Sequence, residues 1–187
     1  MGSMKFHTTP LPDLMLVETT RVEDERGQFS RVFCEAECAA LRPGLHWAQI
    51  NVSLTYAKGT VRGMHFQYPP SAEAKLIRCL RGRVFDVAVD LRSNSPTYLH
   101  WHGVELDESE ASQFFIPEGF AHGFQALTDD AQLLYLHSAV WDREKEGGLR
   151  HDDPAMAIAW PLPVARISDK DQNLPLVKES GFTGITS

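Results

Sequence analysis

Short runs of branched and aromatic residues, separated by turn-forming clusters, recur along most of this chain and constrain its fold more than any other feature. The runs cover residues 14–18, 47–54, 76–80, 84–91, 102–106, 112–116, 123–127 and 132–139. Clusters such as Ala57-Lys58-Gly59 and Arg81-Gly82-Arg83 separate them. Many short strands with regularly spaced turns are typical of an antiparallel sandwich or barrel. The sequence therefore predicts an all-β fold.

Helical signals are few, and no linker, repeat or low-complexity segment divides the chain. Residues 34–41 read as a helix closed by Arg42-Pro43-Gly44, and a second helical turn is expected over residues 107–110. With 187 residues the chain can bury one sizeable core. We expect a single domain over residues 1–187, with Met1-Gly2-Ser3 as a cloning remnant and the Pro-rich segment 161–175 forming no second domain.

Composition excludes several classes of protein. Lys and Arg number 18 against 25 Asp and Glu, so the net charge of −7 lacks the basic footprint of a nucleic-acid binder. The three cysteines are too few for a disulfide framework and suit a reducing compartment. No run approaches the ~18 apolar residues of a membrane span. We therefore expect a cytoplasmic protein that binds neither nucleic acid nor membrane.

A Pro-x-Gly-x-x-His motif joins two of the predicted strands. It runs from Pro117 through Gly119 to His122 and matches the second signature of the cupin jelly roll. The first cupin signature would supply His-x-His and a downstream Glu as metal ligands, but the corresponding segment, residues 62–67, contains only His65. A mononuclear site needs three or more protein ligands. The sequence thus predicts a cupin-type jelly-roll barrel without a metal.

A second histidine pair offers an alternative metal site. His100 and His102 would share one face of a strand, as two ligands should. No Glu or third His follows at a useful distance, and Trp101 between them is typical of a sheet surface. Metal binding there is the weaker interpretation.

The wider pattern resembles the dTDP-4-dehydrorhamnose 3,5-epimerase family over nearly the whole chain. The matching segments, in order, are residues 24–27, 49–51, 61–67, 74–78, 82–92, 95–97, 116–124, 152–154, 160–161 and 168–171. The resemblance implies an isomerase, without cofactor, that inverts carbons beside the ketone of a nucleoside-diphosphate 4-keto-6-deoxyhexose in deoxysugar biosynthesis. It also implies a homodimer.

The resemblance further assigns roles to individual residues. His65 matches the base, Asp171 its partner, and Lys75 the cation near the developing oxyanion at O4. A C–H beside a carbonyl is removed only by a positioned base with the enolate stabilised, so these residue types suit the reaction. Residues matching substrate-binding positions are Arg26 (from the neighbouring subunit), Phe29, Gln49, Asn51, Arg62, Asp86, His122, Tyr135 and Lys170.

One position departs from the family. Counted from Tyr135, the strand position where the family has a catalytic tyrosine is Trp141, whose indole is a poor proton donor. Either water, His137 or Tyr135 returns the proton, or only one carbon is inverted, or the protein binds the nucleotide sugar without efficient turnover. The sequence does not choose among these.

Three other functions stay open beside the epimerase. A 4-keto-sugar ketoisomerase on the same scaffold would also work by proton transfer, and a non-catalytic sugar-nucleotide-binding cupin would account for Trp141. A metal-dependent cupin oxygenase is the third and least favoured.

Overall fold

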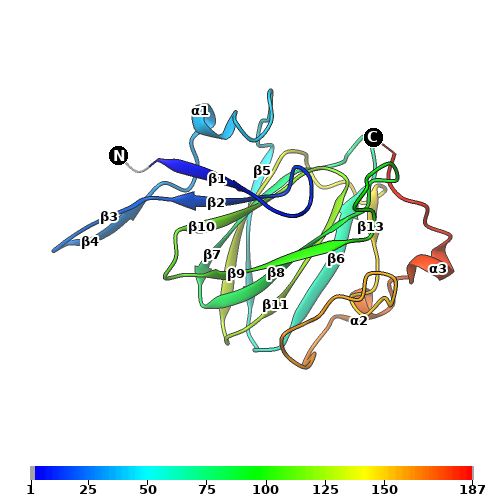
Figure 1. The fold of residues 1–187 in the computed structure, drawn as a ribbon. Coiled ribbons are helices and arrows are strands. Elements are labelled where there is room, and N and C mark those ends of the chain that lie inside the picture. The colour runs from blue at the N-terminus through cyan, green and yellow to red at the C-terminus, as the bar shows by residue number, and fades with distance from the viewer. Residues whose placement is uncertain (1–2, 187) are drawn as a thin grey trace.

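Two antiparallel sheets face each other in the computed structural model, which describes residues 3–186 (Figure 1). The six-stranded sheet has the order β1 (Met4–Thr8), β2 (Met15–Thr19), β10 (Ser112–Ile116), β7 (Lys75–Arg81), β12 (Ala131–His137) and β5 (Gln49–Thr55). The five-stranded sheet has the order β13 (Glu146–Gly148), β6 (Val61–Gln67), β11 (Phe120–Ala126), β8 (Arg83–Asp90) and β9 (Trp101–Asp107). The predicted all-β, cupin-type architecture is confirmed.

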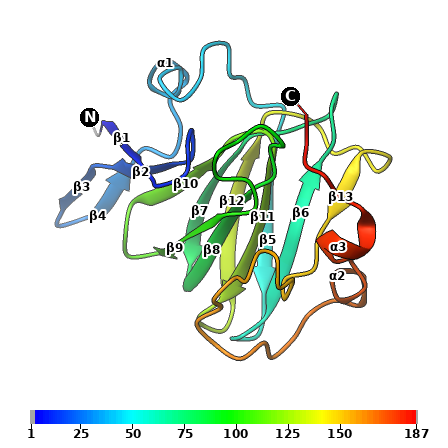
Figure 2. The ribbon, with the colours of Figure 1, turned by 45° about the vertical axis from the view of Figure 1, so that its right-hand side comes forward.

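The remaining elements lie at the margins of this sandwich. A hairpin of β3 (Arg21–Asp24) and β4 (Gly27–Ser30) projects away from the two sheets, and α1 (Glu35–Cys38) follows it (Figure 1). Near the C-terminus, α2 (Asp169–Gln172) and α3 (Val177–Ser180) lie beside β6 and β13 (Figure 2). No helix in residues 3–186 is long and apolar enough to cross a membrane.

The main core fills the space between the sheets. Ala88 and Phe124 of the five-stranded sheet pack with Ile77, Phe114 and Leu133 of the six-stranded sheet, and all five are buried. On β8 the apolar side chains are interrupted by two buried acids, Asp86 and Asp90. These acids each have a partner, described below.

The predicted runs correspond to β2, β5, β7, β8, β9, β10, β11 and β12. The expected helical turn over residues 107–110 is wrong: the Glu110 N–H donates to the Asp107 carbonyl and the Ser109 N–H to the Asp107 carboxylate. These two bonds close a tight turn between β9 and β10 instead. The helix predicted over residues 34–41 corresponds to α1, which is shorter than expected and covers only Glu35–Cys38. Of the expected cloning remnant, Met1 and Gly2 lie outside the described residues.

Two glycines next to or facing β11 allow close approaches within the five-stranded sheet and at its edge. Gly119, in the turn before β11, has a φ of 83°, and a Cβ there would lie 2.6 Å from the Arg92 side chain. Gly63 of β6 has a φ of 114°, and a Cβ there would lie 2.6 Å from the Gly123 Cα of β11. Glycine is required where φ is positive and backbones approach this closely. The turn before β11 and the contact between β6 and β11 therefore both depend on glycine, which has no side chain.

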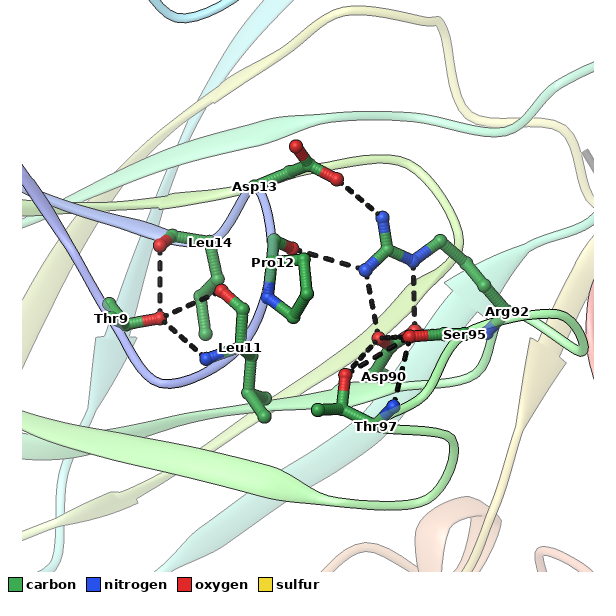
Figure 3. A network of polar contacts seen from close by, with 9 residues as sticks. All are labelled: Thr9, Leu11, Pro12, Asp13, Leu14, Asp90, Arg92, Ser95 and Thr97. Atoms are coloured by element: carbon green, nitrogen blue, oxygen red, sulfur yellow. Dashed lines mark hydrogen bonds and ion pairs between the residues drawn. The ribbon is translucent and has the colours of Figure 1, made fainter.

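A polar clamp fastens the β1–β2 loop to the end of β8 (Figure 3). Arg92 bonds the buried Asp90 carboxylate through Nε and Nη2, and its Nη1 reaches Asp13 at 2.7 Å. Ser95 and Thr97 donate their hydroxyls to the same Asp90 carboxylate. Arg92 also lies 4.7 Å from the centroid of the Phe120 ring at the start of β11. The clamp thus supports the strand that carries His122.

Candidate active site

A cavity of about 610 Å³ opens between the two sheets, a size that suits a small organic ligand. One wall belongs to β6 and β11 of the five-stranded sheet, and the other to β5, β7 and β12 of the six-stranded sheet. The polar side chains that line it are Asn51, Ser53, Thr60, Arg62, His65, Lys75, His122, Tyr135, His137, Arg166, Ser168, Lys170 and Asp171.

A histidine–carboxylate pair stands on the β6 side. His65 Nε2 lies 2.7 Å from Asp171 Oδ1, and while Asp171 is buried, the His65 side chain is 32% exposed toward the cavity. Burial alone would raise the pKa of Asp171, but the hydrogen bonds from His65 and from the Gly63 N–H lower it below its usual value. An ionised carboxylate against one ring nitrogen leaves the other nitrogen to accept a proton.

The short helix α2 delivers Asp171 to this place. Ser168 is its N-cap, and the Ser168 hydroxyl accepts a hydrogen bond from the Asp171 N–H. The Gly63 N–H donates to Asp171 Oδ2 at 3.1 Å and fastens the carboxylate to β6. On the same helix, Lys170 Nζ lies 2.7 Å from Glu146 Oε1 of β13. The Pro-rich segment, expected to form no separate unit, thus carries a residue of the site.

The facing wall presents a cation. Lys75 of β7 is nearly buried and its Nζ lies 3.2 Å from Glu73 Oε1. The other oxygen of Glu73 accepts a hydrogen bond from His137 Nδ1 at 2.8 Å. Burial alone would raise the pKa of Glu73, but the hydrogen bond from His137 and the charge of Lys75 lower it. Glu73 is therefore a carboxylate at neutral pH.

Tyr135 of β12 stands next to Lys75 and His137 on this wall. Its hydroxyl lies 3.0 Å from Ser53 Oγ of the neighbouring strand β5. Its ring stacks on that of His137, with centroids 5.9 Å apart. Burial raises the pKa of the Tyr135 phenol above its usual value. The phenol is consequently protonated at neutral pH and holds a proton on the side opposite His65.

A second histidine–carboxylate pair lies beside the first on the neighbouring strand β11, where His122 pairs with His65 in the strand register. His122 Nε2 lies 2.9 Å from Asp86 Oδ1, and both side chains are buried. Burial lowers the pKa of His122, although the carboxylate of Asp86 acts in the opposite direction. Within residues 3–186, no group of three or more His, Cys, Asp and Glu side chains is arranged to hold a metal ion.

Cationic side chains gather toward the cavity mouth. Arg62 Nε donates to Thr55 Oγ1 at 3.1 Å, and Arg62 Nη2 donates to the Leu54 carbonyl, so both bonds run to β5. Arg166 and Lys170 line the cavity from the C-terminal segment. Several cations around one opening can hold a diphosphate in a chain whose net charge is negative.

The structure does not bring all the predicted residues together. Arg26 and Phe29 lie on the β3–β4 hairpin, with exposed side chains, and line a separate hollow there. Trp141 is 56% exposed and does not line the cavity. Gln49 also lies outside the cavity lining, and its Oε1 accepts a hydrogen bond from the backbone N–H of Trp141 at 3.1 Å. Asp86 acts only through His122.

Sequence reasoning missed Ser53, Glu73 and Arg166, and left His137 undecided. Strand alternation could have found two of them, because Ser53 follows Asn51 by two residues and His137 follows Tyr135 by two. Each pair shares a face. Arg166 lies in the irregular C-terminal segment, where no periodicity identifies a face.

Comparisons with known proteins agree with this geometry. A family model described as dTDP-4-dehydrorhamnose 3,5-epimerase matches residues 8–179. The dTDP-4-dehydrorhamnose 3,5-epimerase of Sinorhizobium fredii is 40% identical over 180 residues, covering 96% of this chain and 92% of that protein. The dTDP-4-dehydrorhamnose 3-epimerase of Streptomyces niveus is 43% identical over 141 residues, covering 75% of this chain and 68% of that protein.

Solved structures superpose over almost the full chain. The dTDP-6-deoxy-D-glucose-3,5-epimerase of Legionella pneumophila, in complex with dTDP-4-keto-L-rhamnose, matches with a TM-score of 0.92 at 35% identity and covers 98% of each chain. A 3'-monoepimerase of Streptomyces bikiniensis was solved with dTDP as a double mutant of one histidine and one tyrosine. It matches with a TM-score of 0.87 at 30% identity, covering 96% of this chain and 92% of that one.

Proposed function

The chain belongs to the dTDP-4-dehydrorhamnose 3,5-epimerase family, and from this premise we propose how its own side chains invert a carbon of a dTDP-linked 4-keto-6-deoxyhexose. The protein is an epimerase of nucleotide sugars in deoxysugar biosynthesis. One observation carries the proposed mechanism: a histidine–carboxylate pair faces a lysine and a half-buried tyrosine across a single cavity.

His65 removes the proton beside the C4 ketone. Among residues 3–186 no side-chain hydrogen bond involves the ring nitrogen of His65 opposite Asp171, and the ring reaches the cavity while the carboxylate stays buried. Asp171 holds one orientation of the ring and stabilises the imidazolium that forms. The bond from carbon to hydrogen breaks, and its electron pair passes into the enolate with the negative charge on O4.

Lys75 stabilises that charge. It is the cation of the β7 strand that lines the cavity, and Glu73 restricts where its Nζ lies. A preorganised cation in a partly dry cavity stabilises a developing oxyanion more than water does. The proton of the substrate then becomes removable near neutral pH.

Tyr135 returns a proton from the other face. Burial keeps its phenol protonated, and it lies on the sheet opposite His65. The two residues replaced in the Streptomyces bikiniensis double mutant are a histidine and a tyrosine as far apart in sequence as His65 and Tyr135 are here. Of the alternatives raised by Trp141, this arrangement favours Tyr135 as the proton donor. Trp141 then belongs to the rim.

Arg62, Arg166 and Lys170 bind the diphosphate at the mouth, and Asn51 contributes an amide. His122, held by Asp86, completes the polar floor as a neutral imidazole. The Legionella relative was solved with dTDP-4-keto-L-rhamnose, which supports dTDP as the nucleotide. No step of this scheme uses a metal or cofactor, so dialysis against EDTA is expected to leave the rate unchanged.

The active form is a homodimer in this proposal. Arg26 and Phe29 stand on a projecting hairpin away from the cavity of their own chain (Figure 1). Edge strand β5 exposes the apolar side chains of Ile50, Val52 and Leu54, which alternate along one face. Exposed apolar edge strands require cover, and a second copy would supply it while its hairpin brings the Arg26 guanidinium and the Phe29 ring to the site.

Mixing two inactive variants tests the exchange of hairpins. His65→Ala and Arg26→Ala subunits, unfolded and refolded together, would form mixed dimers with one complete site each. Random pairing should restore about a quarter of the wild-type rate. No recovery, or a monomer in sedimentation, would remove Arg26 from the site.

The three free cysteines support a reducing, cytoplasmic location.

The reaction itself is tested by following dTDP-4-keto-6-deoxyglucose in D₂O by proton NMR, with an enzyme-free control. Deuterium at C3 and C5 with inverted product supports the 3,5-epimerase, and exchange at one carbon indicates a single-site epimerase, as the Streptomyces niveus relative is named. Migration of the ketone to C3 would instead indicate a ketoisomerase. Tight binding without exchange would indicate the binding protein and refute the proposal.

A further inference from the structure

Glu73, Lys75 and His137 form a cluster that the mechanism above uses only in part. His137 of β12 pairs directly with Lys75 of β7 in the strand register, so the two side chains stand next to each other on the cavity face. Glu73 lies behind them and is absent from the cavity lining. One carboxylate thus contacts both cavity residues, at 3.2 Å for Lys75 Nζ and 2.8 Å for His137 Nδ1.

The Glu73 carboxylate determines the hydrogen-bonding character of His137. An ionised carboxylate only accepts hydrogen bonds, so Nδ1 of His137 must carry a proton. The neutral ring then has its lone pair on Nε2. Among the described residues, His137 makes no other side-chain hydrogen bond, and its ring lines the cavity. The wall therefore offers the Lys75 ammonium as a donor beside the His137 Nε2 as an acceptor.

We propose that this pair recognises the α-hydroxyketone of the sugar, with Lys75 donating to O4 and His137 Nε2 accepting from the C3 hydroxyl. Glu73 is the positioning residue that fixes both groups. The inference rests on the proposed epimerase function and adds a specificity determinant to it. A carbonyl flanked by a hydroxyl needs one donor and one acceptor side by side, which is what the Lys75–His137 pair supplies.

The two carbons flanking the ketone differ in a way that such a pair can detect. C3 of a 4-keto-6-deoxyhexose carries a hydroxyl, whereas C5 carries a methyl group that forms no hydrogen bond. Contact with His137 therefore places C3 on the β12 side of Lys75 and fixes which end of the ketone C5 occupies. A site built to bind a hydroxyl discriminates against an analogue that lacks it.

The experiment compares two substrates and follows deuterium exchange at C5, the carbon both share. One is dTDP-4-keto-6-deoxyglucose, and the other is its 3-deoxy analogue. Exchange by the wild-type enzyme on the first substrate is measured before any variant, and its absence would refute the proposed function rather than this inference. The variants are His137→Phe, which keeps a ring, and Glu73→Gln, which keeps the shape of the side chain but not its charge.

With the hydroxyl-bearing substrate, His137→Phe should lower kcat/KM about tenfold, the usual weight of one hydrogen bond. With the 3-deoxy substrate the loss should be less than about twofold, because no hydroxyl remains to be recognised. Glu73→Gln should also lose more on the hydroxyl-bearing substrate than on the 3-deoxy substrate, but it should slow both, because Glu73 also holds Lys75. Equal losses by His137→Phe on both substrates would overturn the proposal. If the 3-deoxy ketone binds without exchange, its Kd by calorimetry is compared in the same way.

Ring-nitrogen NMR reports the tautomer of His137, which would not depend on Glu73 if Glu73 only supported the fold. Long-range proton–nitrogen spectra should show the Nδ1–H form for His137, identified by the signal that His137→Phe removes. Glu73→Gln should change that pattern, because an amide can donate as well as accept. Glu105→Gln is the matched control. Glu105 lies on the edge strand β9 and forms an exposed ion pair with Arg83 of β8, so its replacement should change neither the spectrum nor the kinetics. An Nε2–H form in the wild type would refute the inference.

Discussion

Asp171→Asn is expected to disable His65 without disturbing the cavity. The replacement keeps the size of the side chain but removes the negative charge that lies 2.7 Å from His65 Nε2. Its amide can also donate toward the ring and favour the wrong tautomer. Both effects act where the imidazolium forms, so the loss should appear in kcat more than in KM.

The size of the effect follows from the geometry of the pair. Two charges about 4 Å apart interact by ~4 kcal/mol at an effective dielectric constant of about 20, and by ~1 kcal/mol in water. Asp171 is buried, but His65 is 32% exposed, which screens part of the interaction. A contribution of about 2–3 kcal/mol is appropriate, which lowers kcat roughly 30- to 160-fold at 1.36 kcal/mol for each factor of ten.

The assay is deuterium exchange at C3 and C5, measured with saturating nucleotide sugar. Asp169→Asn is the matched control: Asp169 lies on the same helix with an exposed side chain and makes no side-chain contact with His65. It should retain the wild-type rate within about twofold. If Asp171→Asn stays within threefold of wild type, or if both variants lose activity equally, Asp171 does not support the base.

Three further predictions use other parts of the structure. Tyr135→Phe should abolish inversion while exchange from the His65 face persists, because only the returning proton is lost; NMR detects deuterium without product. Trp141→Tyr should change the rate less than about threefold, since the side chain lies outside the cavity. Asp90→Asn should cost about 3 kcal/mol and lower Tm by roughly 6–12 °C in calorimetry. Burial alone would raise the pKa of Asp90, but the hydrogen bonds from Arg92 and the neighbouring hydroxyls lower it. The stability that Asp90 contributes is therefore lost in the wild type as the pH falls below 3.8. The variant lacks this contribution at every pH and should not show that loss.

The strands that the sequence predicts well are those whose residues bury a continuous apolar face. β10 was predicted with the bounds that the structure has, because its residues are buried on both sides. The hairpin β3–β4 was missed, since its mostly polar and exposed residues show no clear alternation. The edge strand β1 was missed because its alternation, Met4 and Phe6 against Lys5 and His7, is too short to stand out. β6 was noticed only as a motif, because its Gly63 and His65 serve the cavity rather than the core.

The site could be assembled from sequence only as far as motifs reach. His65, Lys75 and Asp171 lie on three elements whose proximity no local pattern reveals, and the family resemblance supplied it. Trp141 stands out in the sequence only by its distance along the chain from Tyr135, whereas the fold leaves its side chain 56% exposed and outside the cavity lining, with Tyr135 inside. Whether a side chain lines a cavity depends on which sheet covers it, which is a long-range property.

Inversion at a carbon requires a base and an acid on opposite faces of a planar enolate, and the two-sheet architecture meets that requirement directly. In the proposed mechanism the base His65 and the neutral His122 stand on the five-stranded sheet, whereas Lys75, Tyr135 and His137 stand on the six-stranded sheet. A substrate ring held flat between the sheets would expose one face to each. The partner of each working group lies behind it, in its own layer: α2 supplies Asp171 to the first wall, and Glu73 serves the second. Changing the chemistry of one wall therefore leaves the other in place, so loss of the acid should convert an epimerase into an enzyme that only exchanges the proton.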